Sequence, residues 1–148
     1  MNEMTLSKKN YKFFEMARKE ATNSDYRNVH VGCVIVYKGH VIGQGFNRDK
    51  SDTVQKKYNS YRHFNHTEKP IKHSIHAEIA ALKSIPYPIA NTVDWKKVSV
   101  YIYRICPGKS LGQGLSRPCK ACMNALRDMG IKDIYYTTED GYANEKIF

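Results

Sequence analysis

The stretch HVGCVIVYKGHVIGQGF, residues 30–46, decides the fold. It contains two runs rich in apolar and β-branched residues, His30–Tyr37 and His40–Phe46, which are joined by Lys38 and Gly39. Two such runs separated by a two-residue link with a glycine are typical of a β-hairpin, because glycine accepts the backbone conformation of a tight turn. We therefore expect two antiparallel strands here.

Outward from the hairpin, helical and extended patterns alternate along the chain. Apolar residues at helical spacing predict three helices, and β-branched or aromatic runs predict further strands. The expected helices run from the capping residue Ser7 to about Ala21, from His76 to Ile85 and from Cys119 to about Met129, and the further strands are Val98–Ile105, Ile131–Thr137 and a short return over Tyr142–Ile147. This order predicts an α/β domain in which helices cover the faces of a mixed sheet.

Length and composition are typical of one globular domain, residues 1–148. Apolar residues make up 41% of the chain and no apolar segment has the length of a membrane span, so we expect no membrane partner. The polar N-terminal residues lack the apolar run of a secretory signal, which indicates a cytoplasmic protein without a disulfide framework. A formal net charge of +10 favours phosphates or nucleic acid as partners, although a basic solvated surface has the same composition.

A long polar and basic segment, Asn47–Ser74, follows the hairpin. Its cations are interleaved with Tyr58, Tyr61 and Phe64, a mixture that suits either a solvated face or phosphate contacts and base stacking with a single strand of nucleic acid. Part of the segment, around Thr53–Tyr61, is expected to be helical.

The same segment carries three histidines, His63, His66 and His73. We interpret them as solvated side chains, with a second metal ion or a substrate phosphate as alternative ligands. We expect Cys33, which lies inside the first strand of the hairpin, to be a small buried apolar residue.

Two short motifs carry the chemistry: His-Ala-Glu at 76–78 and Pro-Cys-Lys-Ala-Cys at 118–122, each at the start of an expected helix. Imidazole nitrogen and thiolate sulfur are ligands that zinc prefers, in tetrahedral geometry. Two cysteines one helical turn apart can bind the same ion, and the N-terminal end of a helix favours thiolates. We therefore expect His76, Cys119 and Cys122 to bind one zinc ion per chain.

The number of ligands favours a catalytic site over a structural one. Structural zinc normally has four protein ligands, whereas three leave a position open to water, which zinc acidifies. Glu78 lies near the metal without being needed as a ligand, and it suits the role of general acid and base; the alternative is an ordinary acidic residue in a first helical turn. Two further alternatives stay open: a structural zinc completed by His73 or Cys106, and a redox Cys-x-x-Cys pair.

Together the two motifs resemble the zinc-binding signature of the cytidine and deoxycytidylate deaminase superfamily, and the hairpin and the segment Met129–Tyr136 are similar to parts of these enzymes. The resemblance covers roughly Tyr11–Ile147. It implies the three-layer cytidine-deaminase-like fold, hydrolytic deamination of cytosine or less often adenine, and a homo-oligomer. It also implies that Glu78 is the catalytic acid and base, that the main chain of Ala77 helps to hold the base, and that Asn47 contacts the sugar.

The substrate class stays open at this point. The leading hypothesis is a cytidine or deoxycytidine nucleoside or nucleotide, whose phosphate would account for part of the positive charge and which Arg104 or Arg117 would face. The alternatives are cytosine or adenine within single-stranded DNA or RNA, and a non-catalytic nucleic-acid-binding module, against which the intact Glu78 argues. Two departures from the simplest pattern bear on this choice: 39 residues separate Glu78 from Pro118, and the Glu-Asp-Gly turn at 139–141 predicts an antiparallel ending.

Overall fold

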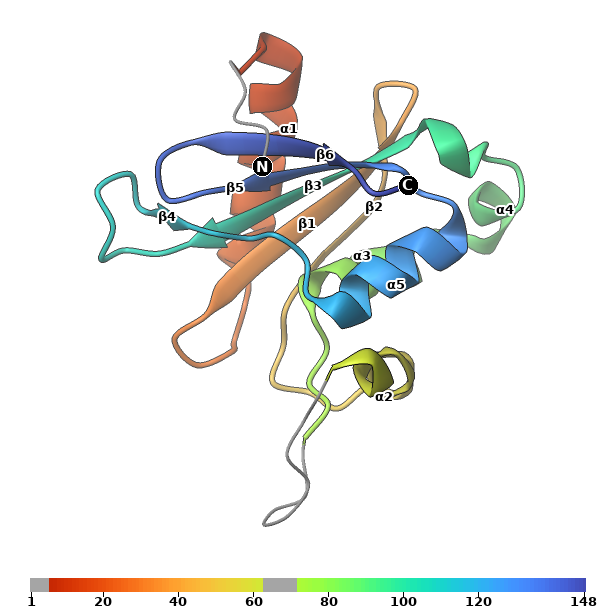
Figure 1. The fold of residues 1–148 in the computed structure, drawn as a ribbon, viewed down its shortest axis with the longest axis horizontal. Coiled ribbons are helices and arrows are strands. Elements are labelled where there is room, and N and C mark those ends of the chain that lie inside the picture. The colour runs from red at the N-terminus through yellow and green to blue at the C-terminus, as the bar shows by residue number, and fades with distance from the viewer. Residues whose placement is uncertain (1–5, 63–71) are drawn as a thin grey trace.

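A six-stranded mixed sheet forms the centre of the computed structural model, which describes residues 6–62 and 72–148 (Figure 1). The strands are β1 (His30–Tyr37), β2 (His40–Phe46), β3 (Val98–Ile105), β4 (Gln113–Gly114), β5 (Asp133–Thr137) and β6 (Tyr142–Lys146). They lie in the order β2-β1-β3-β5-β6, and the short β4 pairs with β3. Strands β3 and β5 pair in parallel, and the other strand pairs of the described residues are antiparallel.

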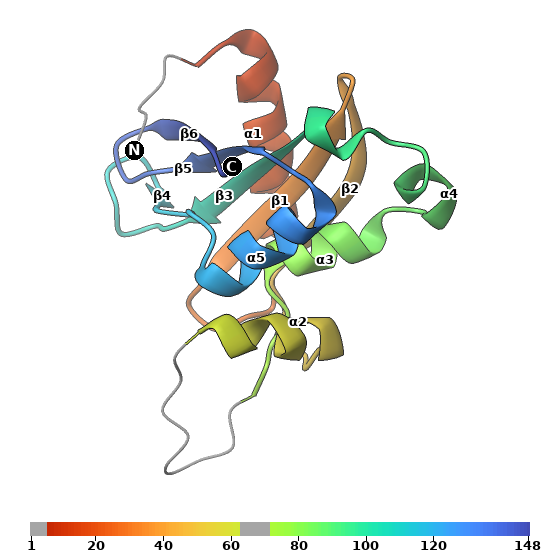
Figure 2. The ribbon, with the colours of Figure 1, turned by 45° about the vertical axis from the view of Figure 1, so that its right-hand side comes forward.

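Helices lie on both faces of this sheet (Figures 1 and 2). On one face lies α1 (Lys8–Ala21), and on the other lie α3 (Ala77–Ser84) and α5 (Lys120–Met129), next to which α2 (Thr53–Tyr58) and the 3₁₀ turn η1 (Asn59–Tyr61) pack. The remaining short helices are α4 (Tyr87–Ala90) and η2 (Trp95–Lys97). The predicted three-layer α/β architecture is therefore confirmed. Within the described residues, every helix is too short or too polar to cross a membrane.

The hairpin that anchors the sheet is present as predicted. Lys38 (φ 51°) and Gly39 (φ 79°) both take the left-handed backbone conformation, which is the requirement of a two-residue turn that matches the twist of the strands. Tyr37 pairs with His40 across this turn, and the register shifts once, between Ile35 and Val36.

Alternate residues of the central strands face different layers, so a period of two in the sequence assigns each side chain to its core. The core on the α1 side contains Phe13, Phe14, Ala17, Val34, Val36, Tyr101 and Tyr103. The core on the α3 and α5 side contains Cys33, Ile35, Val100 and Ile102 from the strands, with Leu126, Ile134 and Tyr136 among their partners. Cys33 is fully buried there, as expected.

Two glycines of β2 allow α3 to lie directly on the sheet. A Cβ atom at Gly43 would come within 2.7 Å of the carbonyl oxygen of Ala81, and one at Gly45 within 2.6 Å of the main-chain nitrogen of Ala81. Such distances are too short for real atoms, so any larger residue would push the helix away from the sheet. The contact fixes the height of α3, and with it the positions of His76 and Glu78 at its N-terminal end.

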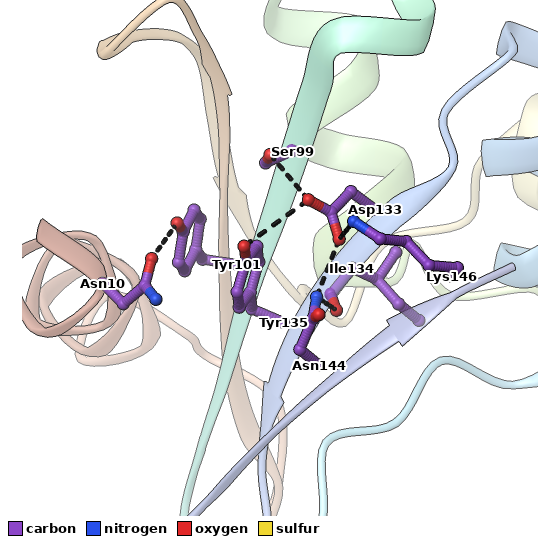
Figure 3. Close-up of polar contacts among 8 residues, drawn as sticks. All are labelled: Asn10, Ser99, Tyr101, Asp133, Ile134, Tyr135, Asn144 and Lys146. Carbon is purple, nitrogen blue, oxygen red and sulfur yellow. Dashed lines mark hydrogen bonds and ion pairs between the residues drawn. The ribbon is translucent and has the colours of Figure 1, made fainter. Parts of the chain in front are cut away.

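The antiparallel ending formed by β5 and β6 was predicted correctly, and a polar network around Asp133 holds it in register (Figure 3). One carboxylate oxygen of Asp133 accepts a hydrogen bond from Asn144 Nδ2 (2.7 Å) and pairs with Lys146 Nζ (2.8 Å). The other accepts hydrogen bonds from the hydroxyl groups of Ser99 and Tyr135, both at 3.5 Å. Because the donors belong to β3, β5 and β6, the network fastens three neighbouring strands.

Tyr101 joins this part of the sheet to α1 (Figure 3). Its ring stacks on that of Tyr135, with centroids 4.4 Å apart and planes at 4°. Its hydroxyl group donates a hydrogen bond of 2.6 Å to Asn10 Oδ1, and Phe14 packs edge-on against the same ring at 5.3 Å. Aromatic contacts and one hydrogen bond therefore fix α1 on the sheet.

Some short elements differ from the sequence-based expectation. Segment 106–117, expected as a loop, contains β4, and α4 follows the break at Pro86. The sequence could not predict β4 because a strand of two residues shows no periodicity. It could not exclude α4 because proline is tolerated in the first turn of a helix. Strand β5 begins at Asp133, two residues later than expected.

Candidate metal centre and active site

The two ligand motifs lie at the N-terminal ends of α3 and α5, which are side by side on one face of the sheet (Figures 1 and 2). His76 caps α3 with an extended backbone (φ −84°, ψ 159°), and Cys119 caps α5 in the same way (φ −69°, ψ 171°). Both helices therefore begin one residue later than predicted, at Ala77 and Lys120, while Cys122 lies in the first turn of α5.

The distances between the ligand atoms fit a zinc ion. His76 Nδ1 lies 3.6 Å from Cys119 Sγ and 3.4 Å from Cys122 Sγ. In a tetrahedral zinc site with ordinary metal–ligand distances, nitrogen and sulfur ligands are roughly 3.5 Å apart. The donor set and its spacing therefore suit zinc, with Nδ1 as the imidazole ligand atom.

A fourth protein ligand is not found among residues 6–62 and 72–148, where the potential metal-binding group consists of His76, Cys119 and Cys122. His73 is 2.9 Å from the side chain of Asn59 through its Nδ1, and Cys106 lies at the base of the β3–β4 loop. Neither joins the group, so the arrangement matches the three-ligand set of a catalytic zinc. The alternatives raised for His63 and His66 concern residues outside the described ranges.

The three candidate ligands, His76, Cys119 and Cys122, form a hydrogen-bonded group that shares a proton, which a metal ion can replace. The hydrogen bond from the Cys122 thiol, helped by His76, lowers the pKa of Cys119 to about 3 even though burial opposes this shift. The same bond, together with burial, raises the pKa of Cys122 well above its usual value. Burial lowers the pKa of His76, but the hydrogen bond to Cys119 and the charge of Glu78 outweigh it and raise that pKa. Metal binding would release the proton that the two sulfurs share.

Glu78 lies in the first turn of α3 and lines the same pocket as His76 and Cys119, with 5% of its surface exposed. Burial raises the pKa of its carboxyl group; His76 opposes this shift, and the Cys119 thiolate adds to it. A carboxyl group whose pKa is raised toward neutrality is suited to accept a proton and to return it.

A cavity of about 400 Å³ opens beside the ligands. Ala77 and Asn47, the two predicted substrate-binding residues, both line it. The amide group of Asn47 holds the start of β1, because its Oδ1 accepts from Val31 N (2.9 Å) and its Nδ2 donates to Val29 O (2.8 Å). Asn47 therefore shapes the pocket wall as well as facing the cavity.

Four cations line the cavity: Arg62, Lys72, Arg104 and Arg117. Arg117 forms a two-point ion pair with Glu145, at 2.9 and 3.1 Å. Lys72 pairs with Asp49 at 2.7 Å. Both arginines that the sequence singled out, Arg104 and Arg117, thus reach the pocket, and the basic segment contributes Arg62 and Lys72.

Other residues of the site gave no sequence signal. Tyr26, Asn59 and Ser116 line the cavity, and Gln55 lies behind it in hydrogen-bond contact with His76. The hydroxyl group of Ser116 positions this residue by donating to the carbonyl oxygen of Ile102 (2.9 Å), which lies 14 positions earlier in the chain. Contacts of this range leave no local pattern in the sequence.

Comparison with known proteins agrees with this site. The model of the cytidine and deoxycytidylate deaminase zinc-binding region matches residues 7–138. The tRNA-specific adenosine deaminase subunit tad2 of Schizosaccharomyces pombe is 30% identical over 122 residues, which are 82% of this chain and 23% of the relative. The chain therefore spans less than a quarter of the length of that relative.

Solved structures share the fold. The cytidine deaminase from Burkholderia pseudomallei has a TM-score of 0.58 at 18% identity, over 97% of this chain and 94% of that one. The dCMP deaminase from the cyanophage S-TIM5 has a TM-score of 0.55 at 20% identity, over 91% of this chain and 86% of that one. The family model matches most of the chain, so the chain belongs to the cytidine and deoxycytidylate deaminase family, and its candidate ligands have the geometry of a zinc site.

Proposed function

We propose that the protein deaminates the cytosine base of a nucleotide by hydrolysis, with zinc held by His76, Cys119 and Cys122 and with Glu78 as proton carrier. The observation that carries the proposal is the buried carboxyl group of Glu78 on the wall of the pocket that the three ligands line or adjoin. When bound, zinc supplies a water acidic enough to attack the ring carbon that bears the amino group. Glu78 would take one proton from the attacking water and give it to the ring nitrogen, and would then pass the remaining hydroxyl proton to the departing amine, which leaves as ammonia.

Two further pocket residues hold the nucleoside in this proposal. Ala77 is the first residue of α3, where main-chain N–H groups have no partner within the helix, and we assign its N–H to the base. Asn47 uses one hydrogen-bonding position of Oδ1 on Val31 and one of Nδ2 on Val29. An amide group has two positions on each atom, so a sugar hydroxyl can occupy the others.

Arg104 supports a substrate with a phosphate group. It follows Ile102 by two residues on β3, so both side chains face the side of the sheet that carries the pocket. A Cβ atom at Gly114 would lie 3.3 Å from Arg104 Cδ, so this glycine gives the arginine room to cross β4. Among the residues that the structure describes, Arg104 forms no ion pair, in contrast to Arg117 and Lys72. It is therefore a cation available to an anionic substrate.

Replacing Arg104 tests this role. We expect Arg104→Gln to raise KM for cytidine 5′-monophosphate by about 10- to 100-fold, because a charge-assisted hydrogen bond contributes roughly 1.5–3 kcal/mol. KM for cytidine should change little. Steady-state kinetics on both substrates measures the difference, and Lys109→Gln, which removes a surface partner of Glu139, is the control. Equal losses on the two substrates would contradict a phosphate contact.

A second candidate function is deamination of a base within RNA or single-stranded DNA. It is favoured by the 30% identical relative, which is named as a subunit of a tRNA-specific adenosine deaminase. It is also favoured by the surface of α2 and η1, where Tyr58 and Tyr61 stack at 6.4 Å and Lys57 Nζ lies 5.2 Å from the Tyr58 ring centroid. The exposed ring of Tyr61, next to the half-buried Tyr58 and to nearby cations, suits base stacking and backbone contacts.

A deamination panel read by mass spectrometry separates the two candidates. It contains cytidine, deoxycytidine, their monophosphates, and oligomers of single-stranded DNA and RNA that carry cytosine or adenine. Turnover of monophosphates with a shallow salt dependence would support the nucleotide function. Preference for an oligomer would support the nucleic-acid function. Binding of that oligomer should then fall steeply with salt and after replacement of Lys56 and Lys57 by neutral residues. Oligomer binding without any turnover would instead indicate a non-catalytic module.

A further inference from the structure

A chain of buried amide groups runs behind the metal centre and takes no part in the chemistry proposed above. The main-chain N–H of His76 donates to Gln55 Oε1 at 2.9 Å. Gln55 Nε2 then donates to Asn59 Oδ1 at 2.8 Å, and Asn59 Nδ2 lies 2.9 Å from His73 Nδ1. Gln55 is completely buried, so water does not substitute for its two partners, and Asn59 is 3% exposed at the edge of the cavity.

The direction of every bond in this chain is fixed by its first member. A main-chain N–H can only donate, so the Gln55 atom that faces His76 must be oxygen. The other end of the Gln55 amide is then a donor, which makes the facing Asn59 atom oxygen and turns Asn59 Nδ2 toward His73. His73 Nδ1 must accept that bond, so this ring carries its proton on Nε2.

The segment that contributes Gln55 and Asn59 is joined to both helices that carry metal ligands. The hydroxyl group of Tyr58 donates to Asp128 of α5 at 2.7 Å. Asp52, which caps α2, pairs with Lys83 of α3. The α2–η1 segment therefore spans the two halves of the metal centre.

We infer that Gln55 is a positioning residue for the metal centre: it holds the main chain at His76 so that the imidazole Nδ1 stays in register with the two sulfurs. His76 needs such a support because it is an N-cap with an extended backbone and no side-chain capping bond of its own. The polarity of the Gln55–Asn59–His73 chain holds the Gln55 amide in the required orientation. This inference rests on the proposed function only in taking His76 as a zinc ligand.

Zinc affinity, measured by competition with a chromophoric chelator, tests the inference. We expect Gln55→Met, which keeps the side-chain volume but removes both polar atoms, to weaken zinc binding by about 10- to 100-fold, as loss of a supporting hydrogen bond behind a ligand typically does. Gln55→Glu keeps an acceptor for His76 and should lose less affinity than Gln55→Met. The matched control is Gln44→Met on the exposed side of β2, which should bind zinc like the wild type.

An unchanged affinity in folded Gln55→Met would overturn the inference, and so would equal losses in Gln55→Met and Gln44→Met. Absence of zinc from the wild type would overturn the proposed function instead, so the two failures are distinguishable. Circular dichroism establishes that each variant is folded.

The position of the proton on the His73 ring gives a second test. If Gln55 only filled space, it would not determine which ring nitrogen carries the proton. Nitrogen-15 NMR of the wild type should show His73 as the neutral ring with its proton on Nε2. Gln55→Glu, with nearly unchanged volume, serves if Gln55→Met does not fold: its carboxylate cannot donate to Asn59, so Asn59 should turn its Nδ2 toward the carboxylate and its Oδ1 toward His73, which moves the His73 proton to Nδ1. A wild-type His73 protonated on Nδ1 would contradict the direction of the chain and overturn the inference.

Discussion

We expect Glu78→Gln to lower the rate of deamination by about 100- to 10,000-fold while the protein keeps its fold and its zinc. The expected size is that of general acid–base catalysis. Glutamine has nearly the same shape, so the buried site does not open a cavity, but an amide group cannot carry the proton from the attacking water to the base and the amine. Single-turnover kinetics measures the loss, and elemental analysis measures the metal content of the same sample.

Glu139→Gln is the matched control for this experiment, since Glu139 is an exposed acid paired with Lys109 on the surface. It should turn over substrate at the wild-type rate. If Glu78→Gln retained near-normal activity with zinc bound, the proton would be carried by another group and the role assigned to Glu78 would be wrong. Loss of zinc from Glu78→Gln would mean that this carboxylate is a ligand.

We expect Cys122→Ser to remove zinc and, with it, the activity. The sulfur of Cys122 lies 3.4 Å from His76 Nδ1, and a serine hydroxyl group in its place stays protonated and binds zinc poorly. Because Cys122 is fully buried, no other side chain can replace it as a ligand. We expect the zinc content to fall from about one ion per chain to a small fraction. The thermal midpoint should fall as well, because a ligand that binds the folded state stabilises it.

Cys106→Ser is the control for this prediction and also separates two kinds of zinc site. Cys106 lies outside the potential metal-binding group, so this variant should keep both zinc and activity. If Cys106→Ser also lost zinc, the ion would have a fourth protein ligand and a structural role. Chelation of the wild type, followed by return of zinc, should abolish and then restore activity; a fully active metal-free protein would rule out the mechanism.

Much of the fold follows from short-range sequence patterns. The hairpin at 30–46 was predictable because its turn residues have to take positive φ and its apolar residues follow strand spacing. The antiparallel ending was predictable from a turn motif at 139–141. In contrast, β4 consists of two residues that pair with β3, and its existence depends on where the chain returns, which no local pattern records.

The grouping of the three candidate ligands was predictable for the same reason: zinc accepts few ligand types, and the cysteine spacing brings two of them onto one helical turn. The residues that support the ligands were not. Gln55 lies in a short polar helix, and its importance comes from reaching His76, which is 21 positions away in the sequence. Asn47 illustrates the opposite case, because its place on the pocket wall was predicted but its bonds to Val29 and Val31 were not.

Because α3 lies directly on Gly43 and Gly45, the two halves of the metal centre differ in how well they tolerate substitutions. One half is His76 on α3, and the other is Cys119 and Cys122 on α5. The His76 half rests on main-chain atoms, and a backbone cannot repack to absorb a new methyl group. The Cys119 half rests on side chains of α5 such as Leu126, which can exchange volume with their neighbours. Under laboratory evolution toward a larger base, we therefore expect accepted substitutions to accumulate in α5, while the glycines of β2 stay unchanged.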